Sequence, residues 1–158
     1  MPDSDQELAF QASVFGAVGT SGQRCTTLRR LFIHDSIYDK FVERLVKAYP
    51  KFEERMGDPL DENTLMGPLH NKMAVDGYVN GLEEIKKQGG KILVGGEVVK
   101  GNYVLPTIVE IAHDAKIVQH EIFAPILYVF KFSTLEEAIA MNNEVPQGLS
   151  SSIFTKNL

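Results

Sequence analysis

The sequence contains a single cysteine, and this scarcity excludes two common uses of the residue. One thiol cannot form a disulfide within the chain, and zinc sites built from paired cysteines need at least two. Cys25 is therefore left either with a chemical role or with a place in the packing. Most free cysteines are small buried hydrophobes, so the residues around Cys25 must decide between these interpretations.

Charge and hydropathy exclude two further classes of protein. The 158 residues carry 16 basic and 21 acidic side chains, a formal net charge of −5, with no block of like charge. We therefore expect no nucleic acid partner. No apolar run approaches the roughly 18 residues that span a bilayer, and the acidic start MPDSDQE does not resemble a secretory signal. We expect a soluble protein of the cell interior, cytoplasmic or mitochondrial, without membrane contact.

Metal and phosphate motifs are also missing. No histidine pair has HxH or HxxxH spacing, so no metal site is predicted. The glycine pairs at 89–90 and 95–96 lack the GxGxxG spacing before a helix, and turns explain them better. Two alternatives stay open: a noncatalytic binding module with an inert thiol, and a cysteine hydrolase or acyltransferase that pairs Cys25 with one histidine. The candidates by count are His34, His70, His113 and His120.

Hydrophobic periodicity predicts an α/β fold with a largely parallel sheet and flanking helices. Helices are expected over about 4–18, 37–52, 75–88 and 134–143, the first capped by Asp3 or Ser4. Strands are expected over 29–34, 91–94, 103–111, 126–132 and 150–154. The segment ILYVFKF at 126–132 is apolar apart from one lysine, which is typical of a strand covered on both faces. The alternation of helices and strands indicates one α/β domain.

Two short stretches carry groups suited to chemistry. GTSGQRCTT places Cys25 in a turn of small residues, where a thiolate is accessible and exposed backbone N–H groups can stabilise an oxyanion. HEIFAP, at 120–125, lies directly before the strand at 126–132, which would fix the directions of Glu121 and Phe123 toward a ligand. The alternatives are a packed thiol, a solvated acid and a core phenylalanine, and spacing alone leaves them open.

Four stretches together resemble the aldehyde dehydrogenase superfamily. They are GQRCT, MGDPLDENTLMGPL, GNYVLPTIV and HEIFAPILYVFKF, and they occur in the family's order and separations. The stretches RCTTLRRLFIH, HEIFAPILYVFKF and NNEVPQGLSSSIFTK are most similar to the antiquitin branch, the α-aminoadipic semialdehyde dehydrogenases. The resemblance covers almost the whole chain. It implies the family's catalytic-domain fold and the oxidation of an aldehyde to its carboxylic acid with NAD.

The resemblance also implies roles for individual residues. Cys25 matches the nucleophile that attacks the aldehyde carbon to form a thiohemiacetal, which passes hydride to NAD and leaves a thioester for hydrolysis. Glu121 matches the acid that holds the nicotinamide ribose, and Phe123 the aromatic near the nicotinamide. Arg24 is a candidate to pair with the distal carboxylate of a semialdehyde. For Arg24 the alternative is a structural arginine fixed by backbone carbonyls.

The chain also departs from the family's pattern. Only 24 residues precede Cys25, so the family's catalytic glutamate, its oxyanion-hole asparagine and its NAD-binding domain have no counterpart here. The chain likewise stops before the family's substrate-anchoring loop and its oligomerisation segments. We therefore expect residues 1–158 to be a partial catalytic domain with little or no turnover alone, belonging to a homo-oligomeric parent protein.

Overall fold

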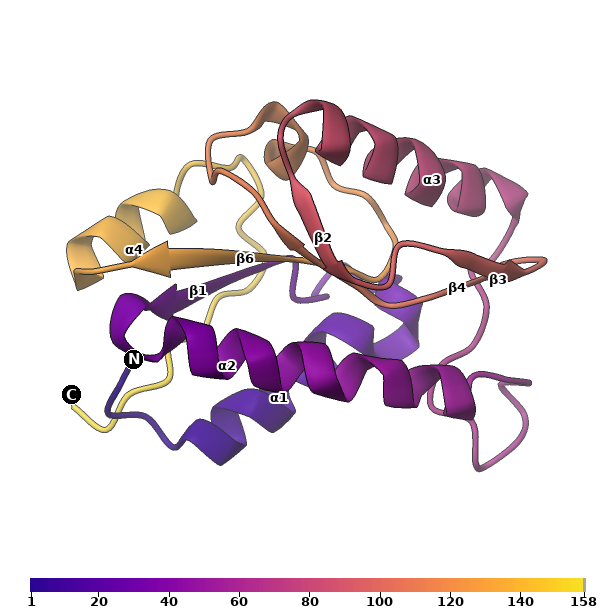
Figure 1. Cartoon of the computed structure of the whole chain (residues 1–158), viewed down its shortest axis with the longest axis horizontal. Helices are drawn as coiled ribbons and strands as arrows, with labels where there is room; N and C mark the ends of the chain where they lie inside the picture. Colours follow the sequence, from indigo (N-terminus) through magenta and orange to yellow (C-terminus); the bar gives the residue numbers. More distant parts are fainter. Residues whose placement is uncertain (158) are drawn as a thin grey trace.

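Strand β6 (Ile126–Phe132) forms the centre of a four-stranded sheet in the computed structural model, which describes residues 1–157 (Figure 1). The strand order is β1-β6-β5-β2. Both β1 (Arg30–His34) and β5 (Thr107–Glu110) run parallel to β6, while β2 (Lys91–Val94) pairs antiparallel with β5. The predicted α/β class with a largely parallel sheet is confirmed.

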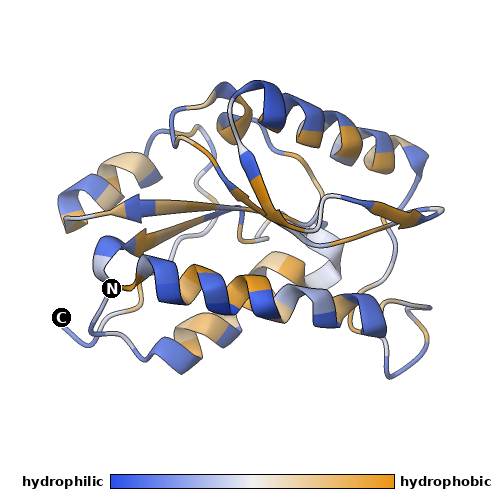
Figure 2. Ribbon diagram, viewed as in Figure 1, coloured by the Kyte–Doolittle hydropathy of each residue, from blue (hydrophilic) through white to orange (hydrophobic). Residues whose placement is uncertain are grey.

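Helices cover both faces of this sheet, and each face has its own core. The helices α1 (Gln6–Val18) and α2 (Asp35–Ala48) lie on one face, and α3 (Lys72–Lys87) lies on the other (Figure 1). Along β6, Tyr128 packs into the α3 core and Val129 into the α1–α2 core. All residues of β6 except Lys131 are buried, as predicted for a strand covered on both faces. Figure 2 shows the apolar stripes of α2 and α3 turned toward the sheet.

The remaining elements are short. A hairpin joins β3 (Val98–Lys100) to β4 (Tyr103–Val104), and α4 (Leu135–Asn142) follows β6. Three 3₁₀ segments complete the list of elements: η1 (Gly19–Gly22), η2 (Tyr49–Arg55) and η3 (Lys116–Gln119). None of the helices formed within residues 1–157 is long and apolar enough to cross a bilayer.

Side-chain caps fix where the helices begin. Asp5, and not Asp3 or Ser4, caps α1 by accepting hydrogen bonds from Glu7 N and Leu8 N, both at 3.0 Å. Asp3 instead binds the C-terminal segment, where Thr155 Oγ1 donates to it at 2.7 Å. The first helix therefore starts at Gln6, later than the sequence pattern predicted.

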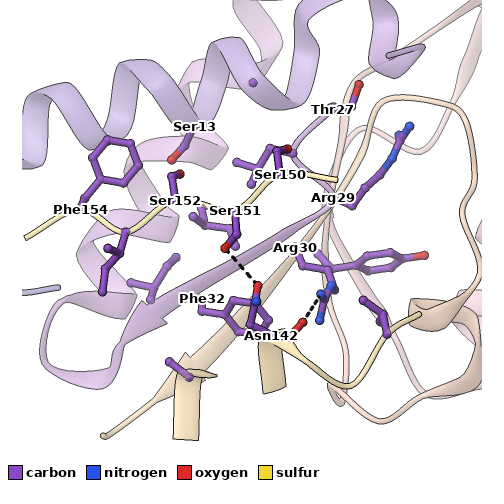
Figure 3. A pocket seen from close by; sticks show the side chains of 18 of the residues that line it. Ser13, Thr27, Arg29, Arg30, Phe32, Asn142, Ser150, Ser151, Ser152 and Phe154 are labelled. Carbon is purple, nitrogen blue, oxygen red and sulfur yellow. Dashed lines mark hydrogen bonds between the residues drawn. The ribbon is translucent and has the colours of Figure 1, made fainter. Parts of the chain in front are cut away.

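Two predicted strands differ in the structure. The expected strand at 103–111 is divided at Pro106, which has no N–H for a ladder: β4 belongs to the hairpin and β5 to the main sheet. The expected strand at 150–154 was wrong, since these residues form no regular structure. A cavity of about 500 Å³ lies between them and β1, lined by Ser150, Ser152 and Phe32 among others (Figure 3). Within residues 1–157, β1 pairs only with β6, and the segment 150–154 adds no strand to its other edge.

Two buried tyrosines differ in whether their hydroxyl groups are satisfied. Tyr78 Oη donates to Leu105 O at 2.9 Å and lies 2.7 Å from Thr107 Oγ1. Thr107 Oγ1 in turn accepts from Gly96 N at 2.9 Å, so one polar cluster holds α3 to the sheet. Burial raises the pKa of Tyr78 to about 12, which keeps the hydroxyl protonated as a donor. Tyr49 Oη is also buried, but it has no hydrogen-bond partner within residues 1–157.

These two hydroxyls give a matched pair of substitutions. We expect Tyr78→Phe to lower the free energy of unfolding by about 0.5–1.5 kcal/mol, because it removes the hydroxyl that links α3 to Leu105 O and Thr107 Oγ1. Tyr49→Phe removes an unpaired polar atom and should change the free energy of unfolding by less than about 0.5 kcal/mol, or raise it. Urea denaturation of both variants measures the difference. Equal losses would contradict the polar cluster's contribution.

Candidate functional site

The loop before Cys25 has an uncommon backbone conformation. Thr20, Ser21 and Gly22 have φ angles of 56°, 53° and 71°, three left-handed residues in succession. Two of them are not glycine, and such residues cost about 1–3 kcal/mol each and persist only where their surroundings hold them. Contacts with the segment 67–70 provide that support. Ser21 Oγ donates to Gly67 O at 2.6 Å, and His70 N donates to Gln23 Oε1 at 2.9 Å.

Cys25 itself lies exposed in a closed turn. Thr27 N donates to Arg24 O at 3.0 Å, and Arg24 N donates to Thr27 Oγ1 at 3.1 Å. The backbone N–H of Cys25 has no hydrogen-bond partner among residues 1–157. The turn thus presents an accessible sulfur beside a free N–H donor, which suits the attack of a thiolate on a carbonyl carbon and the stabilisation of the resulting oxyanion. The alternative of a thiol packed in the core does not fit this position.

Arg29 connects the Cys25 loop to the stretch HEIFAP, and the sequence analysis missed it. Its Nη2 donates to Gly22 O at 2.8 Å, and its Nη1 donates to Ala124 O at 2.9 Å. The same guanidinium lies 3.4 Å from Glu121 Oε1 and 5.2 Å from the centroid of the Phe123 ring. The only signal in the sequence was the place of Arg29 at the start of a strand with buried neighbours. A solvent-exposed arginine fits that place equally well.

The environment of Arg29 explains how a partly buried charge is tolerated. Burial lowers the pKa of Arg29, while the carboxylate of Glu121 raises it. The guanidinium stays protonated in either case, because an arginine side chain is essentially always charged in proteins. Three backbone carbonyls, those of Gly22, Arg24 and Ala124, and one carboxylate replace most of the lost water, although the buried Nε has no hydrogen-bond partner within residues 1–157.

The structure brings Cys25 and Glu121 to one cavity and leaves Phe123 beside it. Cys25, Arg29 and Glu121 all line the 500 Å³ cavity, whose interior Figure 3 shows around Arg29 and Thr27. Glu121 also borders a shallower hollow together with Phe123. The Glu121 side chain is 40% exposed and Phe123 is 43% exposed, so both can contact a ligand. Phe123 is therefore not a core phenylalanine, whereas an exposed Glu121 is also compatible with a solvated acid, so its role stays a prediction.

Arg24 packs against the end of α1. Its Nη2 donates to Phe15 O at 3.4 Å, and its guanidinium carbon lies 5.2 Å from the centroid of the Phe15 ring. This is the arrangement expected of a structural arginine. A role for Arg24 in binding the distal carboxylate of a substrate stays a prediction.

The histidines do not form an obvious base for Cys25. Across residues 1–157, no histidine is hydrogen-bonded to the thiol, and no group of three or more potential ligands could hold a metal ion. His34 accepts from Ser36 N at the start of α2, and His113 lies 2.7 Å from Glu144. His70 contacts Gln23 at 3.2 Å. His120 lines the same cavity as Cys25, but no hydrogen bond joins the two residues, so activation of the thiol by a histidine stays a prediction.

Comparisons with known proteins agree on one family. The sequence model of the aldehyde dehydrogenase family matches residues 1–158. A putative aldehyde dehydrogenase family 7 member A1 homolog from Caenorhabditis elegans is 60% identical, over 99% of this chain and 30% of that protein. The α-aminoadipic semialdehyde dehydrogenase of Rattus norvegicus is 57% identical, over 99% of this chain and 29% of that protein. The chain therefore spans about a third of the length of these relatives.

Solved structures give the same result for the fold. The NAD⁺ complex of an aldehyde dehydrogenase from Bacillus cereus superposes with a TM-score of 0.94 at 33% identity, over 100% of this chain and 32% of that one. Lactaldehyde dehydrogenase from Escherichia coli superposes with a TM-score of 0.92 at 38% identity, over 99% of this chain and 33% of that one.

Gly22 offers a test of how closely the two loops approach. A Cβ added at Gly22 would lie 2.3 Å from Ala124 C, and its φ of +71° disfavours any side chain. We expect Gly22→Ala to lower the free energy of unfolding by at least about 1 kcal/mol and to change the rate of Cys25 alkylation by iodoacetamide. Gly77→Ala is the control, because the exposed Gly77 in α3 has open space around it. It should stabilise the chain by about 0.5–1 kcal/mol and leave alkylation unchanged. Similar alkylation rates in both variants would count against the close approach.

Proposed function

Since the chain belongs to the aldehyde dehydrogenase family, we propose that it supplies the nucleophile-bearing part of an NAD-dependent enzyme that oxidises an aldehyde with a distal carboxylate. The substrate class follows from the relatives named α-aminoadipic semialdehyde dehydrogenase. The observation that carries the proposal is the exposed Cys25, in a turn that leaves its own N–H free, on one cavity with Glu121. Oxidation of an aldehyde through a thiol needs these groups together.

The chemistry of the proposed reaction is centred on Cys25. The thiolate attacks the aldehyde carbon, a carbon–sulfur bond forms, and the carbonyl oxygen becomes an alkoxide that accepts from the Cys25 N–H. Return of the electron pair from oxygen expels hydride and leaves a thioester on the sulfur. NAD, when bound, supplies the acceptor for that hydride. Hydrolysis of the thioester then releases the carboxylic acid and restores the thiol.

Glu121 and Phe123 have the chemistry to hold the cofactor that the family implies. One oxygen of Glu121 contacts Arg29, and its side chain is open enough to accept hydrogen bonds from the hydroxyls of a ribose. Phe123 is a partly exposed aromatic side chain that borders the same hollow as this carboxylate and contacts Arg29, and such a ring suits contact with a flat heteroaromatic ring. Both residues therefore fit a nicotinamide nucleoside, in agreement with the NAD⁺ complex named among the similar structures.

The isolated chain should nevertheless turn over little or no substrate. The relatives are about three times as long. The family resemblance implies that the catalytic glutamate and the NAD-binding domain belong to parts that this chain does not cover. We infer that the 158 residues form a partial catalytic domain of a homo-oligomeric enzyme. Catalysis then needs the family's other segments in place around Cys25.

A hybrid enzyme tests the role of Cys25. The 158 residues replace the matching segment of the rat relative, and formation of NADH from α-aminoadipic semialdehyde is followed. We expect the hybrid to be active and Cys25→Ser to lower kcat by on the order of a thousandfold or more, because the nucleophile is lost. Thr26→Ser, one position away, is the control and should retain activity. A hybrid that stays active with Cys25→Ser would overturn the proposal, and loss of thiol-dependent ester hydrolysis in histidine variants would instead favour a cysteine hydrolase.

The same hybrid tests substrate selection by Arg24. If its guanidinium pairs with the distal carboxylate, Arg24→Ala raises KM for α-aminoadipic semialdehyde by about tenfold, and KM for hexanal much less. Arg44→Ala is the matched control, because Arg44 also packs over a phenylalanine of α1, Phe10. An equal rise in KM for both aldehydes would assign Arg24 a structural role only.

A further inference from the structure

Arg29 and Arg30 are adjacent arginines that both donate to backbone carbonyls, but their partners lie in different segments. Arg30 donates from Nη1 to Met141 O and from Nη2 to Asn142 O, both at 2.8 Å, and its guanidinium carbon lies 5.3 Å from the Phe32 ring centroid. Arg30 therefore fixes the end of α4 to β1. Arg29 likewise binds backbone carbonyls and faces a phenylalanine, but its partners Gly22 O, Arg24 O and Ala124 O belong to two loops that both reach the candidate site.

The two shortest hydrogen bonds of Arg29 fix a distance between those loops. Gly22 O lies three residues before Cys25, and Ala124 O lies three residues after Glu121. A guanidinium is rigid and planar, so two carbonyls bound to its two Nη atoms are held at a set separation. A lysine ammonium keeps the charge but lacks this fork, and it cannot hold both carbonyls in the same geometry.

Arg29 also determines which part of the Glu121 carboxylate stays available. Its contact is with Oε1 at 3.4 Å, and Oε2 has no hydrogen-bond partner within residues 1–157. The ring of Phe123 packs beneath the same guanidinium. One side chain thus holds the acid and the aromatic ring that the proposed function assigns to the nicotinamide nucleoside, together with the loop that carries the thiol.

We propose that Arg29 is a positioning residue, which sets the separation of Cys25 from Glu121 and turns one oxygen of Glu121 toward the ligand. The proposal rests on the proposed function for its meaning in catalysis. Its structural part does not depend on catalysis. The guanidinium of Arg29 holds the loops 19–27 and 120–125 at a fixed separation. Arg29 contacts neither the aldehyde nor the hydride in this scheme.

The test compares Arg29→Lys with Arg30→Lys in the 158-residue chain, without substrate or NAD. Both variants keep the charge and lose one two-carbonyl fork, so both should lose similar stability in urea denaturation. We expect Arg29→Lys to speed amide hydrogen exchange in 120–126 by about tenfold, as the loss of one charge-assisted hydrogen bond allows. The reporter is Ala124 N, which donates to Ile122 O at 2.8 Å. The rate of Cys25 alkylation should change in the same variant, and Arg30→Lys should alter neither quantity.

Two outcomes would overturn the proposal. In the first, exchange and alkylation are unchanged in Arg29→Lys, or Arg30→Lys changes them equally. Arg29 would then be a structural residue like its neighbour. Should Arg29→Lys fail to fold, Glu121→Gln gives a second test, because the half-exposed Glu121 can be replaced without loss of the core. It removes the ion pair and should speed exchange in 120–126 while leaving Cys25 alkylation within about twofold, since the two carbonyl bonds remain. Unchanged exchange there would also overturn the proposal.

These readouts are independent of the dehydrogenase reaction. If the hybrid enzyme proves inactive but Arg29→Lys still changes exchange in 120–126 and Cys25 alkylation where Arg30→Lys does not, the proposed function fails and the positioning role stands. If the hybrid is active and the two lysine variants behave alike, the positioning role fails alone. In an active hybrid, Arg29→Lys should raise KM for NAD and lower kcat, and Arg30→Lys should do neither beyond its effect on stability.

Discussion

The two-sided burial of β6 is the constraint on which the rest of the structure depends. Because β6 is covered on both faces, it must have hydrogen-bonded neighbours on both edges, and β1 and β5 both run parallel to it. Parallel strands start at the same edge of a sheet. The segment before β1 holds Cys25, and the segment before β6 holds Glu121 and Phe123, so one edge collects all three residues. The parallel direction of the strands therefore places these residues at one edge of the sheet, and side-chain contacts only adjust their positions there.

Much of this arrangement was predictable from the sequence, because its main elements carry strong local patterns. The apolar run at 126–132 predicted the central strand, and the glycines around Cys25 predicted an exposed turn. The family resemblance is confirmed by the match over residues 1–158. The roles of Cys25, Arg24, Glu121 and Phe123 in catalysis and binding stay predictions, because neither the fold nor the comparisons test them.

Other features were not predictable, because they depend on contacts between distant residues. SSSIF at 150–154 has the composition of a strand, but a strand also needs a partner edge within hydrogen-bonding distance, and composition does not provide that information. Arg29 and Arg30 look equivalent in the sequence. Only their partners, 95 and 111 residues away, distinguish the arginine that joins the two loops from the arginine that caps α4.

The ties between the Cys25 loop and the segment 67–70 also bear on how the chain folds. Ser21 and Gln23 reach residues 46 and 47 positions away, so the left-handed run at 20–22 gains its support only after a long stretch of chain has closed. Closing such a stretch costs loop entropy, so the supported form of the turn requires residues 67–70 to be in place. The alkylation rate of the lone thiol therefore also reports whether this distant segment is docked against the turn.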